Sequence, residues 1–334
     1  MNEPLNIAIS GVGGDVGQGV VKSLEISEFD INFFLLSSDL DSAFLYLYKD
    51  TFLSPRVADP NYLNFIKRFI VKFKIQLFIP TIDSEISLFA EAAQEIEIET
   101  GCKVFVNSSM ATAVTQDKWE TFKFLRDSGF ATPHTVVQGS LGLAEFRERS
   151  HYPIISKPRK GAGSKNITVI YNEAQLEELQ NNHDYIIQDY LDDKLDEVTC
   201  GVYLDDTLNV VGVSVLKRKL KNGSTNLAER LFLPKIEYEV SEVAKKLGTK
   251  YLNVQGKLDG NNIVIFELNG RLSGTVSMVS KIFNAPELYI RENFNGEKLQ
   301  RQETTHGFVS IRFQEEIYTT VGDMEQLIQR SQGI

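Results

Sequence analysis

The feature that most constrains the fold of this sequence is a pair of segments in which polar and apolar residues alternate. In the second segment, Glu267, Asn269 and Arg271 alternate with the apolar residues Phe266 and Leu268. Because alternate side chains of a β-strand share a face, this pattern predicts a strand with two different faces. One face is apolar and belongs to a core, and the other carries a carboxylate, a carboxamide and a guanidinium.

The first segment lies directly upstream and follows the same alternation. Asn253, Gln255 and Lys257 occupy every second position, and the sequence Asp-Gly-Asn-Asn at 259–262 is typical of a hairpin turn. Residues directly opposite each other in an antiparallel pair share a face. We therefore expect Gln255 to lie opposite Glu267.

The same register predicts how the hairpin closes. With Gln255 opposite Glu267, Asp259 lies opposite Ile263 as the closing pair, and residues 260–262 form a three-residue loop. Glycine and asparagine tolerate the left-handed backbone conformation that such loops carry. The two apolar residues between the polar ones are then expected to be buried behind the polar face.

The polar face of the hairpin predicts a metal site. Gln255, Glu267 and Asn269 offer the oxygen ligands that a hard cation such as Mg²⁺ prefers, and Arg271 beside them suits a phosphate. The alternative is a strand edge exposed to solvent, which also produces alternation. A solvated face does not need this set of groups, so we favour a site that holds Mg²⁺ against the phosphates of a nucleotide.

Composition limits the class of protein. The chain has 334 residues, of which 42% are hydrophobic and 24% charged, and its net charge is −10. These values are typical of a globular protein of two or three domains, and the negative charge disfavours nucleic acid or an anionic membrane as partner. We see no charged-then-apolar leader and no apolar run near the ~20 residues that cross a bilayer. Cys102 and Cys200 make no disulfide framework, so we expect a cytoplasmic protein.

The first hundred residues predict a doubly wound α/β domain with a parallel sheet. Buried strands, with helices between them, are expected at residues 6–10, 31–36, 76–80 and 103–106. A glycine-rich turn at 11–19 opens the first helix. Its frame Gly11, Gly14, Gly17 fits only loose variants of the dinucleotide-binding fingerprint. We favour a turn that lines a substrate pocket over one that binds NAD.

A basic loop with two glycines follows a predicted strand in the middle of the chain. Lys157 ends that strand, and the loop at 159–166 leads into a returning strand. Backbone N–H groups in such a loop can surround phosphate oxygens without side-chain hindrance. Gly161, Gly163 and Ser164 therefore predict a lid over a nucleotide, with an ordinary exposed hairpin loop as the alternative.

Other cationic positions have two interpretations each. Lys118 belongs to a predicted helix and is either solvated or in contact with phosphate. Lys217 and Arg218 open the densest cationic cluster of the chain, which is either a phosphate site or a solvated charge run.

Taken in order along the chain, these features resemble the ATP-grasp superfamily, in particular its carbamoyl-phosphate-synthase-like carboxylate–amine ligases. The resemblance covers residues 6–275. Its most specific parts are Asp117-Lys118-Trp119, Lys157-Pro158 with the glycine loop, and Glu267-x-Asn269-x-Arg271. The segment Ile-Pro-Thr-Ile-Asp-Ser-Glu at 79–85 is similar to the end of the family's leading domain.

The resemblance implies a role for each candidate residue, with ATP and Mg²⁺ as cofactors and Mn²⁺ as an alternative metal. It implies phosphate contacts by Lys118 and Lys157, adenine contacts by Gln188, Asp189, Tyr190 and Leu191, and a ribose contact by Glu197. It implies metal binding by Gln255, Glu267 and Asn269, and contacts to the reacting phosphoryl or acyl phosphate group by Lys217, Arg218 and Arg271.

Two positions depart from the family pattern. Gln188 stands where the adenine-binding link usually begins with an acidic residue, so a carboxamide would meet the adenine amino group. Gly270 stands where a proline usually precedes the arginine, which loosens the backbone and leaves the ligands intact.

The reaction that the resemblance implies is the activation of a substrate carboxylate as an acyl phosphate, followed by coupling to an amine, with release of ADP and phosphate. The loop at 159–166 would exclude water from the acyl phosphate. An amino acid or small peptide is the default acid, with a sugar acid as another choice. The alternatives are a split or standalone carbamoyl-phosphate-synthase-like subunit, which would need a glutaminase partner, and a non-catalytic nucleotide-binding protein.

We expect four parts along the chain. These are a Rossmann-like N-terminal domain (1–106), an ATP-grasp small lobe with the glycine lid (107–183), a large lobe with the metal hairpin (184–300) and a C-terminal extension (301–334). The expected partners are a small-molecule carboxylate and an amine, and a homodimer is an alternative to a monomer.

Overall fold

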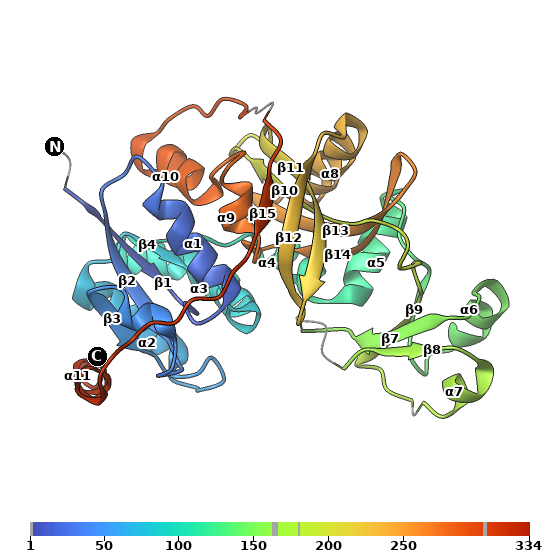
Figure 1. Ribbon diagram of the computed structural model, residues 1–334, viewed down its shortest axis with the longest axis horizontal. Coiled ribbons are helices and arrows are strands. Elements are labelled where there is room, and N and C mark those ends of the chain that lie inside the picture. Colours follow the sequence, from blue (N-terminus) through green and yellow to red (C-terminus); the bar gives the residue numbers. More distant parts are fainter. Residues whose placement is uncertain (1–2, 162–165, 180, 303–305) are drawn as a thin grey trace.

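The computed structural model describes residues 3–161, 166–179, 181–302 and 306–334, which form three sheets flanked by helices (Figure 1). The first sheet has the strand order β3-β2-β1-β4-β5, and all its pairs are parallel. Its strands are β1 (Leu5–Ile9), β2 (Ile31–Ser37), β3 (Asp50–Leu53), β4 (Leu77–Ile79) and β5 (Lys103–Val104). The predicted doubly wound domain is confirmed, and the short edge strand β3 is an addition to it.

Helices cover both faces of this parallel sheet. They are α1 (Asp15–Glu25), α2 (Tyr62–Phe73) and α3 (Asp83–Thr100), with a 3₁₀ turn η1 (Ala43–Tyr46). Alternation along β1 decides which core each residue joins. Ile7 is buried in a cluster with Val20 of α1, whereas Ala8 is buried with Phe69 of α2 and Phe89 of α3.

Backbone packing explains the glycine-rich turn between β1 and α1. Gly11 has φ +62°, a conformation that side chains disfavour. A Cβ atom on Gly17 would lie 2.5 Å from the carbonyl oxygen of Gly11. Both positions need glycine whatever the ligand, so the turn gives no independent support to NAD binding.

The second sheet is a small antiparallel one with the order β6-β9-β7-β8. It consists of β6 (Thr135–Val137), β7 (Ile154–Pro158), β8 (Thr168–Ile170) and β9 (Tyr185–Asp189), with α6 (Leu143–Arg149) and α7 (Glu173–Glu177) beside it. Because β9 pairs with β6 and β7, the small lobe extends to Asp189. The boundary expected after residue 183 therefore falls too early.

The third sheet is the largest, with the order β14-β13-β10-β11-β12-β15. Its strands are β10 (Glu197–Leu204), β11 (Val210–Lys221), β12 (Ser224–Leu231), β13 (Tyr251–Asp259), β14 (Asn262–Asn269) and β15 (Val309–Ile311). Nearby helices are α4 (Ser109–Gln116), α5 (Lys118–Asp127), α8 (Pro234–Leu247), α9 (Val276–Val279) and α10 (Ala285–Asn295). Helix α8 covers one face, where its Val240 packs with Val198 and Val202 of β10.

The C-terminal segment joins two parts of the fold. Strand β15 forms the edge of the large sheet, and α11 (Val321–Ser331) returns to the N-terminal domain beside β3 (Figure 1). There Arg330 donates to the carbonyl of Lys49 at 2.7 Å, and Ser331 accepts from the amide of Leu53 at 2.8 Å. The described residues 306–334 therefore connect the large sheet to the N-terminal domain. Among the described residues, no helix is both long and apolar enough to cross a membrane.

The hairpin of β13 and β14 has the predicted register at its polar end only. Gln255 lies opposite Glu267, as predicted, but the register shifts by one residue between Gln255 and Gly256. Asp259 consequently pairs with Asn262, so the predicted closing pair with Ile263 and the three-residue loop are wrong.

The cause is a β-bulge at Phe266, which has no opposite residue on β13. The bulge places Phe266 and Glu267 in the wall of the same cavity, while Leu268 is fully buried behind them. The expectation that Phe266 is buried is therefore wrong. A Cβ atom on Gly256 would lie 2.6 Å from Cγ1 of Ile263, so the shifted register needs glycine at this position.

Candidate nucleotide and metal site

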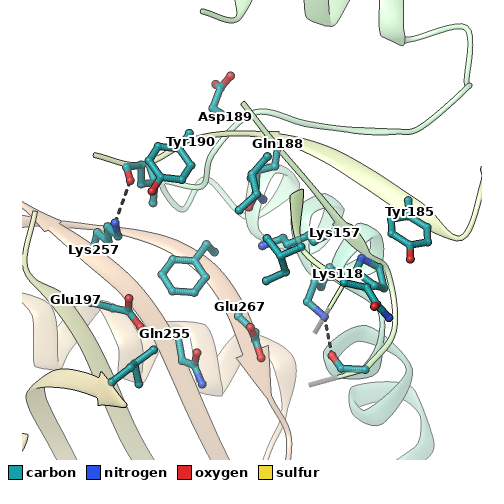
Figure 2. A pocket seen from close by; sticks show the side chains of 18 of the residues that line it. Lys118, Lys157, Tyr185, Gln188, Asp189, Tyr190, Glu197, Gln255, Lys257 and Glu267 are labelled. Carbon is teal, nitrogen blue, oxygen red and sulfur yellow. Dashed lines mark hydrogen bonds between the residues drawn. The ribbon is translucent and has the colours of Figure 1, made fainter. Parts of the chain in front are cut away.

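A cavity of about 550 Å³ lies between the small sheet and the large sheet (Figure 2). Most of the predicted site residues line it, namely Lys118, Lys157, Gly161, Gln188, Asp189, Tyr190, Leu191, Glu197, Arg218, Gln255 and Glu267. They come from both lobes and from the link after β9. Residues separated by up to about 150 positions are thus brought into one space that is large enough for a nucleotide.

Lys157 is the most perturbed cation in the cavity. It is the penultimate residue of β7, its side chain is buried, and its Nζ lies 5.6 Å from the ring centroid of Phe266. Burial lowers the pKa of Lys157, the charge of Glu267 opposes this shift, and the charge of Lys118 adds to it, so that the net pKa is about 8. A bound anion would stabilise the charged form of this buried lysine.

The base of the glycine loop is held by an ion pair next to Lys118. Arg159 donates to Asp117 through Nη2 at 2.7 Å and through Nε at 3.1 Å, while Asp117 also caps α5. The Nζ of Lys118 donates to the carbonyl oxygen of Gly161 at 2.8 Å. Lys118 is thereby kept at the mouth of the loop, where it lines the cavity.

Gln188 has a fixed amide orientation. Its Nε2 donates to Oγ1 of Thr135 at 2.7 Å, and that hydroxyl donates its own proton to the carbonyl of Pro133 at 2.9 Å. Because the hydroxyl has only one proton, it must accept from the amide N–H₂. Oε1 of Gln188 is therefore left as an acceptor, as the carboxylate usual in the family would be.

The link between β9 and β10, residues 190–196, is held in place by Lys257. The sequence pattern placed Lys257 on the polar face but gave it no role. Its Nζ donates to the carbonyls of Leu191 at 2.9 Å and Asp192 at 3.0 Å, and to the carboxylate of Asp193 at 3.1 Å. All three N–H groups are used, so Lys257 fixes the backbone of the link in the cavity wall (Figure 2).

Arg218 connects two predicted groups of the large sheet. Its Nε donates to Oε1 of Glu197 at 2.8 Å, and its Nη2 donates to Oε1 of Gln255 at 2.8 Å. The neighbouring residue Lys217 has the opposite orientation because adjacent strand residues face opposite sides. Lys217 pairs with Asp196 at 2.8 Å and does not line the cavity, so the structure does not place it with Arg218 as expected.

The structure brings two of the three residues predicted to hold a metal into the cavity wall. Gln255 and Glu267 are directly paired and both line the cavity, and Asn269 donates through Nδ2 to Oε1 of Glu267 at 3.2 Å. One carboxylate and two carboxamide oxygens are hard ligands of the kind that Mg²⁺ prefers. Asn269 itself lies behind Glu267 and not in the cavity wall.

Arg271 lies further along the same strand and contacts the N-terminal domain. Its Nε donates to Oδ1 of Asp83 at 2.5 Å, its Nη2 donates to Oδ2 at 2.8 Å, and Nη1 donates to the carbonyl of Leu272 at 2.9 Å. Arg271 does not line the cavity. Glu267, Asn269 and Arg271 thus form a polar row that leads from the cavity to Asp83.

Two predicted lid residues, Gly163 and Ser164, lie outside the described residues. The cavity also contains groups that sequence reasoning missed, above all Phe266, Lys257 and Tyr185. Tyr185 begins β9. Phe266 was missed because the bulge reverses its face, whereas the position of Lys257 on the same face as Gln255 was a usable signal.

Sequence comparison matches two parts of the chain to known families. Residues 115–275 match the ATP-grasp domain, and residues 20–105 match the PylC-like N-terminal domain. A Mycoplasma pneumoniae relative, the uncharacterised MG011 homologue, is 25% identical over 206 residues, which cover 59% of this chain and 70% of that protein. The arginine-specific large chain of carbamoyl phosphate synthase from Bacillus subtilis is 24% identical over 221 residues, which cover 58% of this chain but 20% of that protein.

Structural comparison gives the same fold over nearly the whole chain. The biotin carboxylase domain dimer of 2-oxoglutarate carboxylase from Hydrogenobacter thermophilus, solved with MgADP, ADP and bicarbonate, aligns with a TM-score of 0.72. The alignment covers 93% of this chain and 75% of that one at 14% identity. The chain therefore contains an ATP-grasp domain preceded by a PylC-like N-terminal domain.

Proposed function

We propose that this chain is an ATP-dependent carboxylate–amine ligase that activates its acid substrate as an acyl phosphate. The observation that carries the proposal is the convergence of Lys118, Lys157 and Arg218 on one cavity with Gln255 and Glu267. Cations for a triphosphate and oxygen ligands for a metal share a space of about 550 Å³.

In this proposal, the described residues hold each part of the nucleotide. Gln188 accepts from the adenine amino group, the link fixed by Lys257 contacts the base, and Phe266 lies under it. Glu197, once released from Arg218, contacts the ribose. The Mg²⁺ ion, with Mn²⁺ as an alternative, would be held by Gln255, Glu267 and Asn269, where it neutralises phosphate charge.

The chemistry follows from charge. A triphosphate and a carboxylate repel each other, and Lys118, Lys157 and Arg218 reduce that repulsion. A carboxylate oxygen attacks the γ-phosphorus while the bond to the ADP oxygen breaks, which gives ADP and an acyl phosphate. The amine nitrogen then attacks the acyl carbon, phosphate leaves with the electrons of the C–O bond, and the nitrogen loses a proton. No protein nucleophile is required.

A coupled assay for ADP tests this proposal. The purified chain is given Mg²⁺-ATP with a matrix of acids and amines, and ADP should form only where an acid and an amine are both present. The Glu267→Gln variant is the matched control, since it keeps the size of the side chain and removes the charge. Failure of Mg²⁺-ADP to raise the melting temperature would contradict nucleotide binding altogether.

Location and assembly are part of the same proposal. The thiols of Cys102 and Cys200 are both free and buried, which supports a reducing, cytoplasmic compartment. We propose small molecules as the partners of the site. Light scattering on the purified chain distinguishes a monomer from the homodimer that we keep as an alternative.

A further inference from the structure

Strand β15 (Val309–Ile311) is the outer strand of the large sheet, and in the described part of the chain only one of its sides is paired (Figure 1). On the paired side, the amide N–H of Arg312 donates to the carbonyl of Asn226 in β12 at 2.8 Å. Backbone groups of an antiparallel strand alternate in direction, so the even-numbered residues of this segment face β12. The N–H and C=O groups of Val309, Ile311 and Phe313 therefore point to the unpaired side.

The same three residues carry large apolar side chains that are exposed to solvent. Val309 is 57% exposed, Ile311 65% and Phe313 81%. They alternate with Ser310 and Arg312, so they lie on one face of the strand and form what we call the apolar row. Natural proteins block an open sheet edge with a charged side chain, a proline or a bulge, and the apolar row has none of these. An edge of this kind is a site where another strand can pair.

The opposite edge of the large sheet is covered by the chain itself. There the amide N–H of Ile265 in β14 donates to the carbonyl of Ala131, in the segment that follows α5, at 2.8 Å. Helix α5 also packs beside β14. The fold thus protects one edge with its own residues and leaves the edge at β15 for a second molecule.

The apolar row matches a second copy of itself. Two antiparallel copies of β15 related by a twofold axis at Ile311 place Val309 of each copy opposite Phe313 of the other, and the two Ile311 residues opposite each other. Every outward N–H then meets a C=O of the other copy. The three apolar pairs lie on one face of a continuous sheet, where such pairs stabilise the pairing of strands.

Neighbouring registers are less favourable. An axis at Ser310 sets Phe313 opposite Gly307 and loses an apolar pair. An axis at Arg312 sets the two arginines opposite each other, and like charges in that position are destabilising. The register about Ile311 avoids both.

Charged residues beyond the strand agree with this register. Extending it sets Glu316 of each copy opposite His306 of the other, and both residues are exposed. A carboxylate and an imidazole can therefore meet across the interface without burial of a charge. The net charge of −10 on each chain opposes association, so the apolar row must supply the driving force.

We propose that two copies of this chain form a homodimer in which β15 pairs with β15 of the other copy, antiparallel about Ile311. The two large sheets then continue into each other. The large sheet contributes residues of β10, β11, β13 and β14 to the cavity wall and none of β12 or β15, so the pairing leaves both cavities untouched. The dimer is therefore independent of the proposed function, and either can fail without the other.

Light scattering over a range of protein concentrations tests the dimer. We expect the mass of two chains for the native protein and the mass of one chain for Ile311→Lys, because two lysines would then meet at the axis. Leu141→Lys is the matched control, since Leu141 is 100% exposed and lies in the small lobe, and it should keep the native mass. Circular dichroism of Ile311→Lys should show the native content of helix and strand.

Cysteine cross-linking tests the register without the added charge. Val309→Cys and Phe313→Cys are mixed and mildly oxidised, and a disulfide-linked dimer should form faster in the mixture than in either variant alone. Ile311→Cys should cross-link with itself, because the Cα atoms of a hydrogen-bonded pair lie about 5.5 Å apart, which a disulfide can span. Leu141→Cys should not cross-link. The native thiols of Cys102 and Cys200 are buried and do not take part.

Four results would overturn the proposal. A native protein with the mass of one chain at every concentration would exclude the homodimer. A dimer that persists in Ile311→Lys would place the interface elsewhere, and cross-linking that is no faster in the mixture than in the single variants would reject the register. A monomeric native protein that binds an added extended peptide with the same apolar alternation would assign this edge to a different protein.

Discussion

The Nζ of Lys157 lies 5.6 Å from the ring centroid of Phe266, although Lys157 belongs to the small sheet and Phe266 to the large one. Both residues line the cavity, and Phe266 reaches it only because of the bulge in β14. The contact therefore joins the two lobes across the space that we assign to the nucleotide.

Replacing Phe266 by alanine removes this contact and the flat apolar surface of the cavity wall. We expect the Kd for Mg²⁺-ADP to rise about tenfold, which corresponds to roughly 1.4 kcal/mol. Phe232→Ala is the matched control, because Phe232 also has a cation over its ring, that of Arg230 at 5.1 Å, and does not line the cavity. Equal effects of both changes on the Kd, measured by calorimetry, would show that Phe266 has no role in the site.

The lowered pKa of Lys157 predicts that the protein takes up a proton when it binds nucleotide in mildly alkaline solution. Its pKa is lowered from the usual 10.5 to about 8, so at pH 8.5 much of the free protein carries a neutral amine at this position. Bound phosphates favour the ammonium and raise the pKa again. Calorimetry in buffers of different ionisation enthalpy should show net proton uptake at pH 8.5 and little at pH 6.5.

The same shift predicts the effect of pH on stability without nucleotide. Between about pH 8 and 10.5 the unfolded chain binds more protons at Lys157 than the folded chain does. The contribution of Lys157 to the free energy of unfolding therefore rises with pH.

Substitutions test whether Lys157 is the group that takes up the proton on nucleotide binding. Lys157→Arg should abolish the proton uptake, and Lys123→Arg, on the surface of α5, should not. Uptake that persists in Lys157→Arg would assign it to another group.

Lys257 should act on nucleotide affinity and not on the chemical step. Its Nζ donates to the carbonyls of Leu191 and Asp192, which hold the link in place. We expect Lys257→Met to raise the KM for ATP by tenfold or more with kcat changed by less than threefold. Lys250→Met is a suitable control, since Lys250 is similarly shielded in an ion pair with Glu292 away from the cavity. A loss confined to kcat would contradict this role.

Thr135 should determine the preference for adenine. In the native chain its hydroxyl accepts from Nε2 of Gln188, which leaves Oε1 to accept from an amino group on the base. Thr135→Val frees the amide to rotate, so the ratio of kcat/KM for ATP to that for GTP should fall several-fold. Gln188→Glu should keep the ratio, and Thr225→Val, a buried threonine of β12, should not change it. An unchanged ratio in Thr135→Val would separate Gln188 from base recognition.

The hairpin illustrates what the sequence could and could not predict. Alternation placed Gln255 opposite Glu267, because the polar faces of two adjacent strands must coincide. The sequence also contains a signal of the bulge. The buried apolar residues Ile263 and Ile265 occupy odd positions, whereas the buried Leu268 occupies an even one. The break between Ile265 and Phe266 was the signal that was not used.

Long-range contacts account for what could not be predicted. Lys217 and Arg218 are adjacent cations, and only the pairing of β11 with β10 decides which one faces Glu197. The ion pair between Asp15 and Arg312 joins residues 297 positions apart. No local pattern records such a contact, because it depends on how three sheets and a C-terminal segment pack together.

The fate of the oxygen atoms of the acid substrate tests the central claim most directly. Once the ADP assay has identified an acid and an amine, the acid is labelled with ¹⁸O in both carboxyl oxygens and the phosphate product is analysed by mass spectrometry. An acyl phosphate intermediate predicts one ¹⁸O atom in the phosphate for each amide formed, and no labelled phosphate from the Glu267→Gln variant. Amide formation with unlabelled phosphate would contradict the account.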